Sequence, residues 1–194
     1  MKPILFLDFD DTLVVTRHLV IQFLNSFYRI QIPSDMYLCG NSLEEVVNTY
    51  LPNNKQVTRH QLYDDYAINF LASKKIHDDA YPMEGTEIFI PQLALRYDLW
   101  VVTARQDGCR HVVENLCKKF FSRSIVGMHF VWKRVAPMQF SENASKKQFI
   151  ASTRGEKIAF LDDNPNEVND MYIFSNYFLL RLLMILSPLV FGFL

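Results

Sequence analysis

The sequence predicts an α/β protein in which helices flank a parallel β-sheet, and three observations support this prediction. The chain has four short apolar runs, and three of them end in polar or acidic residues, as buried parallel strands with exposed carboxyl ends do. Segments with helical spacing of apolar residues lie between the last three runs, which is typical of strand–helix–strand units. A helical block at residues 16–80 follows the first run, and we expect it to be an insertion after the first strand.

The first run, ILFLDFDDTLV at residues 4–14, predicts a buried strand that ends in a group of acids. The block behind it shows apolar residues at helical spacing, and Thr16 is a suitable N-cap for its first helix. Turn-forming residues in YLPNNKQ separate the two later helices. The expected helices of the block span residues 16–32, 41–51 and 58–75.

Pro82 and Gly85 mark the return from the helical block, and strands then alternate with helices. The expected elements, in order, are a helix carrying Ile88, Leu93 and Leu95, a strand in LWVVTAR that ends at Thr103, a helix over residues 108–121, a strand in SIVGMHFVW, a helix over residues 145–153 and a strand in KIAFLDD. The predicted organisation is a core from residues 1–15 and 81–170, a helical cap from residues 16–80 and an apolar tail from residues 171–194.

Polar side chains gather where the predicted strands end. The candidates are Asp8 and Asp10, Thr103 and Arg105, Asp162 and Asp163, and the pair Lys146 and Lys147 at a helix start. In open parallel sheets, ligands bind outside the carboxyl ends of the strands. We therefore expect these side chains to meet in one crevice.

The residue types in this group suit phosphoryl transfer. Asp8 and Asp10 share a face of an extended segment, because their spacing is i and i+2. Together with Asp162 and Asp163 they cannot all be ionised in a dry crevice without a cation, and Mg²⁺ is the usual oxygen-liganded ion that also bridges to phosphate. A lysine and a threonine hydroxyl add donors for a phosphoryl group, so a carboxylate nucleophile and an aspartyl-phosphate intermediate are expected.

The segments DFDDTL, LWVVTAR, ASKKQF and IAFLDDNPNEV resemble, in order and spacing, the four motifs of the haloacid dehalogenase-like hydrolase superfamily. YPMEGTEIF resembles the re-entry of that family from a cap into its core. The resemblance covers residues 1–170 and implies a Rossmann-like (Rossmannoid) core, a small helical cap and a Mg²⁺-dependent phosphatase. With TAR in the second motif, the chain is most similar to the 5′(3′)-deoxyribonucleotidases and their relatives.

The resemblance implies a role for each candidate. Asp8 is the expected nucleophile and Asp10 the general acid, whose presence favours phosphate ester cleavage over dehalogenation. The side chain of Asp8, the backbone carbonyl of Asp10 and either Asp162 or Asp163 are expected to bind Mg²⁺. Thr103 is expected to hold the phosphoryl oxygens.

Alternatives remain for the other candidates. Lys146 and Lys147 both qualify as the third-motif lysine, and Lys146 is favoured because it shares a helix face with Phe149 and Ile150. Arg105 is either a substrate contact or the partner of a surface acid such as Asp98. Among neighbouring residues, Asp11 is interpreted as a turn residue, and Thr12 as satisfying backbone groups.

The substrate expected from the resemblance is a small phosphomonoester, with nucleoside monophosphates first. Other small phosphomonoesters stay open, and so does a catalytically idle relative that serves as a binding module. The formal net charge is −1, so no basic footprint for a nucleic-acid polymer is visible. The sequence does not indicate an oligomeric state.

The two ends of the chain bear on location. No signal peptide precedes the first strand, and the three cysteines fit no zinc pattern, so we expect reduced thiols in the cytoplasm. The tail at residues 171–194 is long and apolar enough in principle to cross a bilayer, although Ser175, Asn176 and Arg181 interrupt it. A membrane anchor and an atypical end of the core are both open interpretations.

Overall fold

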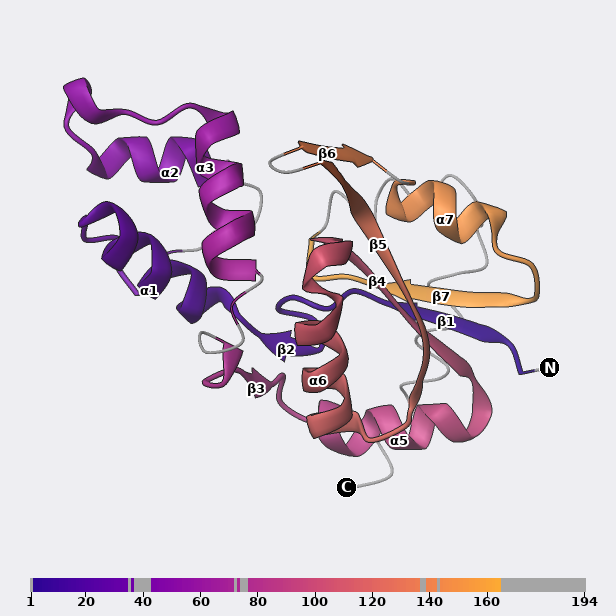
Figure 1. The fold of residues 1–194 in the computed structure, drawn as a ribbon. Helices are drawn as coiled ribbons and strands as arrows, with labels where there is room; N and C mark the ends of the chain where they lie inside the picture. The colour runs from indigo at the N-terminus through magenta and orange to yellow at the C-terminus, as the bar shows by residue number, and fades with distance from the viewer. Residues whose placement is uncertain are drawn as a thin grey trace.

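The computed structural model describes residues 2–34, 36, 43–71, 73, 77–136, 139–142 and 144–164. Figure 1 shows two parts: a sheet with its covering helices, and a set of helices to one side of it. The second part lies between the first strand and the rest of the core in the sequence, and we call it the insert.

The sheet contains four parallel strands and one antiparallel strand, in the order β6-β5-β4-β1-β7. Their bounds are β1 (Ile4–Leu7), β4 (Asp98–Gln106), β5 (Ile125–Ala136), β6 (Gln139–Glu142) and β7 (Lys157–Leu161). Leu7 is in register with Val101 on one side and Leu161 on the other. The ends of these three strands therefore lie side by side, and the predicted α/β class with a parallel sheet is confirmed.

Helices cover both faces of the sheet. Alternate residues of β1 point to opposite faces and pack against different helices. Leu5 and Leu7 belong to the cluster shared with α5 (Thr86–Arg96) and α6 (Arg110–Phe121). Ile4 and Phe6 belong to a second cluster, against α7 (Lys146–Ser152). Burial on both faces explains why the strand is an unbroken apolar run.

The insert contains α1 (Arg17–Tyr28), α2 (Leu43–Tyr50), α3 (Arg59–Tyr66), the short η1 (Asn53–Lys55) and the π-helical η2 (Ala67–Leu71). Helix α1 ends four residues before the predicted end at 32. The reason is that Arg29 turns to φ 55° and Asn25 binds both backbone groups of Ile32, at 2.7 and 3.0 Å. The chain is thereby reversed before the helix can continue.

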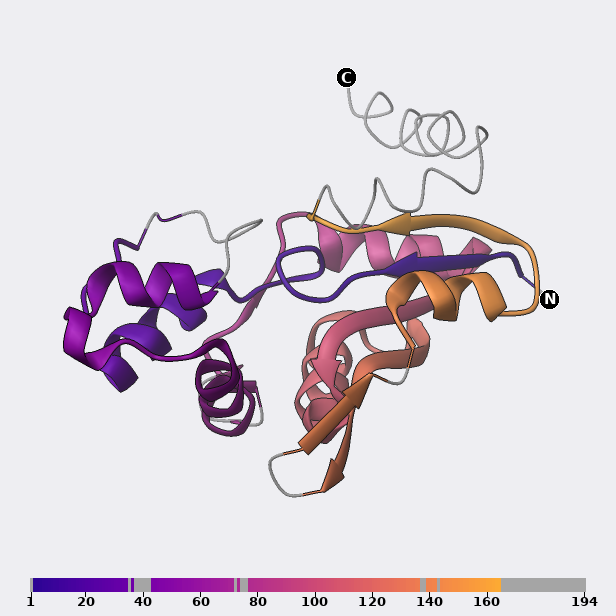
Figure 2. The same ribbon diagram turned by 90° about the horizontal axis from the view of Figure 1, so that it is seen from above.

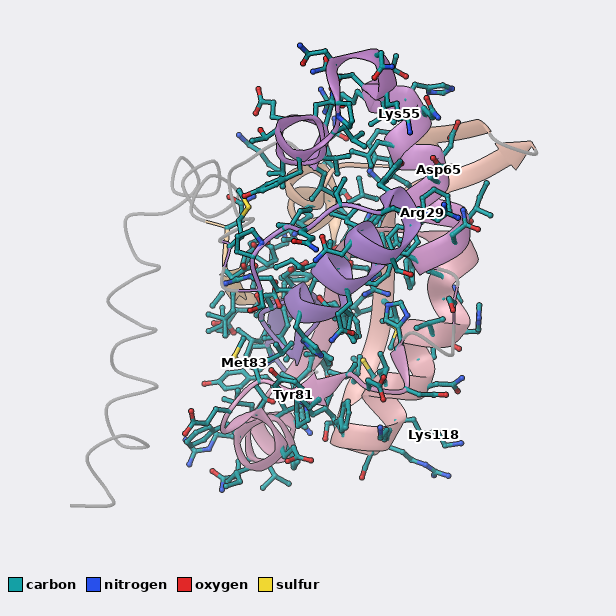
Figure 3. The ribbon with its side chains drawn as sticks, turned by 90° about the vertical axis from the view of Figure 1, so that its left-hand side faces the viewer. Arg29, Lys55, Asp65, Tyr81, Met83 and Lys118 are labelled. Atoms are coloured by element: carbon teal, nitrogen blue, oxygen red, sulfur yellow. The ribbon has the colours of Figure 1, made fainter. Side chains whose placement is uncertain are left out.

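The helices of the insert pack on one another through aromatic side chains. The rings of Tyr66 and Phe70 are stacked 4.9 Å apart, and Phe23 contacts both. The hydroxyl of Tyr28 donates to Asp65 at 3.0 Å, which joins α1 to α3. Figure 3, seen from the side of the insert, shows Asp65 on α3.

Two short strands that the sequence analysis did not predict join the insert to the core. These are β2 (Val14–Val15) and β3 (Tyr81–Pro82), which pair antiparallel. Figure 2 shows the insert beyond the carboxyl end of β1, linked to the core through this region. Strand β6 was also missed, because residues 139–142 lie in a stretch interpreted as a polar loop.

The remaining expectations have mixed outcomes. Helix α5 forms, but Ile88 and Leu95 are 61% and 76% exposed, while Leu93 is buried. Cys109 and Cys117 are buried free thiols. Among the described residues, no helix is long and apolar enough to cross a membrane, and the tail at 171–194 lies outside them.

Candidate active site

Asp8 follows the last residue of β1 and is held at the carboxyl edge of the sheet. Its backbone N–H donates to the carbonyl of Leu161 at 2.8 Å, which extends the pairing of β1 with β7 by one residue. The residue is only 5% exposed. A carboxylate is thus fixed at the junction of two parallel strands.

Lys146 joins Asp8 to the end of β7. Its Nζ donates to Oδ1 of Asp8 at 2.8 Å and to Oδ2 of Asp162 at 2.6 Å. Lys146 is the first residue of α7, whose start is fixed by a capping box between Ser145 and Gln148. Of the two candidate lysines, Lys146 is the one that the structure places on Asp8.

The loop after β7 closes the other side of the cluster. Oδ1 of Asp162 accepts a hydrogen bond from the backbone N–H of Asn164 at 2.8 Å. The backbone N–H of Asp163 donates to the hydroxyl of Thr12 at 3.0 Å. Thr12 thus accepts a hydrogen bond from a backbone group 151 positions further along the chain, as its predicted role requires. One carboxylate oxygen from each of Asp8, Asp162 and Asp163 lies within 4.8 Å of the others.

Burial and the neighbouring charges together set the pKa values of this cluster. Burial raises the pKa of Asp8 to about 8, with Lys146 opposing the shift and Asp162 and Asp10 adding to it. Burial would lower the pKa of Lys146, but the two carboxylates outweigh it and hold that pKa above its usual range. Burial and then Asp162 raise the pKa of Asp163. The carboxylates are therefore electrostatically crowded despite the lysine.

The residues present fit a hard divalent cation. All the donors are oxygens, the ligand type that Mg²⁺ prefers. Among the described residues and the ion pairs shown for them, the acids of this place are Asp8, Asp10, Asp11, Asp162 and Asp163, and the bases paired with them are Arg17, Arg105 and Lys146, two fewer than the acids. An excess of two carboxylates in one partly buried place is the charge that a divalent ion would balance.

Asp10 is held by a different kind of partner. Arg105 binds it with both edges of a fork, from Nε to Oδ2 at 2.8 Å and from Nη2 to Oδ1 at 2.6 Å. The acid that pairs with Arg105 is therefore Asp10 and not Asp98, which corrects that alternative, while a contact with substrate stays a prediction. Burial acts to raise the pKa of Asp10, but Arg105 outweighs it and holds that pKa below its usual range.

Helix α1 is capped by Asp11 and not by Thr16, the residue expected to cap it. Asp11 lies in a turn at φ 54°, and its Oδ1 accepts the backbone N–H groups of Thr16 and Arg17 at 2.9 and 3.1 Å. Asp11 therefore caps α1 from outside the helix. The hydroxyl of Thr16, the expected N-cap, makes no capping bond and donates instead to Asp10 at 2.8 Å.

Thr103 lies near the end of β4 and is 1% exposed. Its hydroxyl accepts the backbone N–H of Arg105 at 3.2 Å, which leaves the hydroxyl proton available to donate. The structure thus brings Asp8, Lys146, Asp162 and Asp163 into one cluster. It places Asp10, Arg105 and Thr103 along the adjoining strand end.

Sequence reasoning missed two residues of the insert side that adjoin this group. Burial and then the charge of Asp10 raise the pKa of Tyr66. His77 is 1% exposed, its Nδ1 lies 2.7 Å from the carbonyl of Ser73, and burial and then Arg105 lower its pKa to about 4. No short motif marks either residue, so only the folded chain could reveal them.

Comparison with known proteins gives a structural likeness only. No family model matches the sequence, and no curated protein matches it significantly. A hydrolase of the haloacid dehalogenase-like family from Streptococcus pneumoniae is similar with a TM-score of 0.53 and 16% identity, over 84% of this chain and 76% of that one. A proposed phosphoglycolate phosphatase from Lactobacillus delbrueckii subsp. bulgaricus aligns with a TM-score of 0.40 and 16% identity, over 66% of this chain and 64% of that one.

Proposed function

We propose that this chain, which has the haloacid dehalogenase-like fold, is a Mg²⁺-dependent phosphomonoester hydrolase that acts through an aspartyl phosphate. The observation that carries the proposal is the ammonium of Lys146 between Asp8 and Asp162, in a cluster of carboxylates at the strand ends. A buried lysine shared by two acids, beside a place for a divalent ion, is arranged for an anionic group such as phosphate.

In the first step, a carboxylate oxygen of Asp8 attacks phosphorus and the bond from phosphorus to the ester oxygen breaks. Because Arg105 holds the pKa of Asp10 low, Asp10 first takes up a proton from solvent. It then passes this proton to the leaving alkoxide, so an alcohol departs and a phosphoryl group remains on Asp8. In the second step, water attacks phosphorus, its proton goes to Asp10, and orthophosphate leaves as the Asp8 carboxylate is restored. Asp10 releases this proton to solvent and so ends each cycle in the protonation state in which it began.

The other side chains serve binding and charge balance. Lys146 balances the charge of Asp8, and the hydroxyl of Thr103 donates to a phosphoryl oxygen. Mg²⁺, held by Asp8, the carbonyl of Asp10 and Asp162 or Asp163, would supply electrostatic stabilisation of the transferring group.

The insert acts in this proposal as a cap that selects the ester. The aromatic side chains of Phe23 and Phe70 give no independent reason for a nucleobase, because they are buried among other side chains of the insert. (Deoxy)nucleoside monophosphates therefore come first on the strength of the sequence resemblance alone. Another small phosphomonoester is the alternative.

The test is phosphate release by the full-length protein in mild detergent from a panel of phosphomonoesters, with Mg²⁺ or EDTA. The panel includes 5′- and 3′-deoxynucleoside monophosphates, sugar phosphates and p-nitrophenyl phosphate. Asp8→Asn removes the nucleophile, and Asp98→Asn removes a carboxylate from the opposite end of a strand as the matched control. Mg²⁺-dependent release that Asp8→Asn alone abolishes supports the proposal, and silence of a folded sample across the panel contradicts it and favours a binding module.

A further inference from the structure

Arg105 is the most buried basic side chain of the site, and the mechanism above gives it no task. It is 2% exposed, whereas the side chain of Asp10 is 33% exposed. The guanidinium thus lies behind the carboxylate as seen from solvent. A substrate can reach Asp10 without reaching Arg105, which argues against a direct contact between Arg105 and substrate.

The contact fixes more than the charge of Asp10. Arg105 binds both oxygens of the carboxylate, and the hydroxyl of Thr16 binds Oδ1 as well. A planar fork on both oxygens determines the rotation of the carboxylate about its bond to Cβ, which a lysine in the same place would not do.

Arg105 is itself held in place from three directions. Its guanidinium lies over the ring of Phe9, 5.1 Å from the centroid, and its backbone N–H donates to Thr103. The pairing of β4 with β5 shifts register between Thr103 and Gln106, so the strand bends at this residue. Nη1 is buried and has no hydrogen-bond partner among the residues that the structure describes. The fork is thus directed at one partner, Asp10.

We infer that Arg105 is a positioning residue that aims the carboxyl group of Asp10 at the ester oxygen of the substrate. This inference rests on the proposed function and adds a residue to it. Arg105 does not bind the phosphoryl group in this scheme, and the side chain acts only through Asp10.

The chemistry of the leaving group separates this role from a structural one. Proton donation by Asp10 matters when the leaving group is a basic alkoxide, and matters little when it is a stabilised phenolate such as p-nitrophenolate. A misplaced Asp10 should therefore slow phosphoryl transfer from an alkyl phosphate far more than transfer from p-nitrophenyl phosphate. A general loss of folding or of phosphate binding would slow both alike.

The experiment measures single-turnover phosphoryl transfer by the full chain with Mg²⁺, from an alkyl phosphate and from p-nitrophenyl phosphate. The variants are Arg105→Met, Arg105→Lys and Asp10→Asn. Arg110→Met is the control, since Arg110 also lies over a ring, that of Phe130 at 4.6 Å, but is 47% exposed and pairs with Glu114. Thermal unfolding establishes that each variant is folded.

We expect Arg105→Met to slow transfer from the alkyl ester by roughly 10²-fold and transfer from the aryl ester by less than about 5-fold, with KM little changed. Asp10→Asn should show the same selectivity, Arg105→Lys a partial recovery, and Arg110→Met no change. Equal losses on both esters, or a raised KM with unchanged kcat, would overturn the inference while leaving the phosphatase proposal in place.

A crystal structure of Arg105→Met decides the positional claim without any turnover. We expect the carboxylate of Asp10 to rotate away from its present orientation. If Thr16 alone keeps it in place, Arg105 is not a positioning residue, whatever the enzyme's activity. Inactivity of the wild-type protein would count against the proposed function, and the Asp10 orientation in this crystal would still decide the inference.

Discussion

Asp8 and Asp10 lie two residues apart, and the fold treats them in opposite ways. Asp8 meets a lysine, which contacts one of its oxygens and shares its charge with Asp162. No residue that the structure describes donates a hydrogen bond to Oδ2 of Asp8. Asp10 meets an arginine, which occupies both of its oxygens.

The difference corresponds to the geometry of the two basic groups. An ammonium is a point charge that can serve two acids at once, while a guanidinium is a flat fork that fixes one acid in one orientation. A carboxylate that attacks phosphorus needs a free oxygen, and Asp8 keeps one. A carboxyl group that must pass a proton in one direction needs a defined orientation, and Asp10 has one.

The largest effect is expected from Asp8→Asn, which replaces the carboxylate whose free oxygen would attack phosphorus. Phosphate release should fall by roughly 10³-fold or more, because a nucleophile is not replaced by its neighbours. The fold should persist, since the amide carries no buried charge and Lys146 keeps Asp162. Phosphate release and thermal unfolding of the same sample measure both effects, and a variant with normal turnover would show that Asp8 is not the nucleophile.

Lys146→Met removes the ammonium that Asp8 and Asp162 share. Two buried carboxylates lose their common partner, so the free energy of unfolding should fall by about 3–5 kcal/mol. Lys147→Met is the matched control on the next residue, and a loss below about 1 kcal/mol is expected there. Urea unfolding at neutral pH without added metal measures both values, and equal losses for the two lysines would contradict the assignment.

Metal addition tests whether the carboxylates around Asp8 form a cation site. Mg²⁺ at 100 times its Kd should stabilise the folded protein by about 2.7 kcal/mol, and EDTA should remove this gain. Asp162→Asn and Asp163→Asn should reduce the gain, whereas Asp98→Asn should keep it. A thermal shift that is the same in all four proteins would mean that Mg²⁺ binds elsewhere.

The smallest effect concerns the second anchor of Asp10. Thr16→Val removes one hydrogen bond to Oδ1 and should lower the free energy of unfolding by about 1 kcal/mol. In a double-mutant cycle with Asp10→Asn, a coupling of about 0.5 kcal/mol or more is expected for two groups in contact. Additive losses in urea unfolding would show that the contact has no energetic weight and that the fork of Arg105 acts alone.

The sequence was sufficient for the parts of the fold that depend on local pattern. The strands β1, β4, β5 and β7 are apolar because both faces of the sheet are covered, and their polar ends are readable for the same reason. Lys146 could be preferred over Lys147 because a helix face is also a local pattern. Strand β6 and the pair β2 and β3 were missed, since short strands carry little periodicity.

The contacts of the site were harder to predict because they depend on three-dimensional register. The residues Asp10 and Arg105 are 95 positions apart, and their pairing needs the alignment of β1 with β4 and the bend after Thr103. Asp11 and Thr16 are close in sequence, but the capping of α1 by Asp11 in place of Thr16 depends on the turn at Asp11. The apolar tail lies outside the described residues, so its role remains a prediction.

The two-residue ladder between β2 and β3 has a consequence for how the molecule could be rebuilt. Val15 pairs with Tyr81, and the backbone N–H of Met83 donates to the carbonyl of Leu13 at 2.9 Å, so both crossings between core and insert run through one small antiparallel clamp. In topological terms, the whole insert is the loop that connects the two strands of a β-hairpin, β2 and β3. A tight turn such as Asn-Gly could close the same hairpin. The insert could in this sense be exchanged for another segment. Thr16, the residue before α1, would have to be kept, because its hydroxyl donates to Asp10.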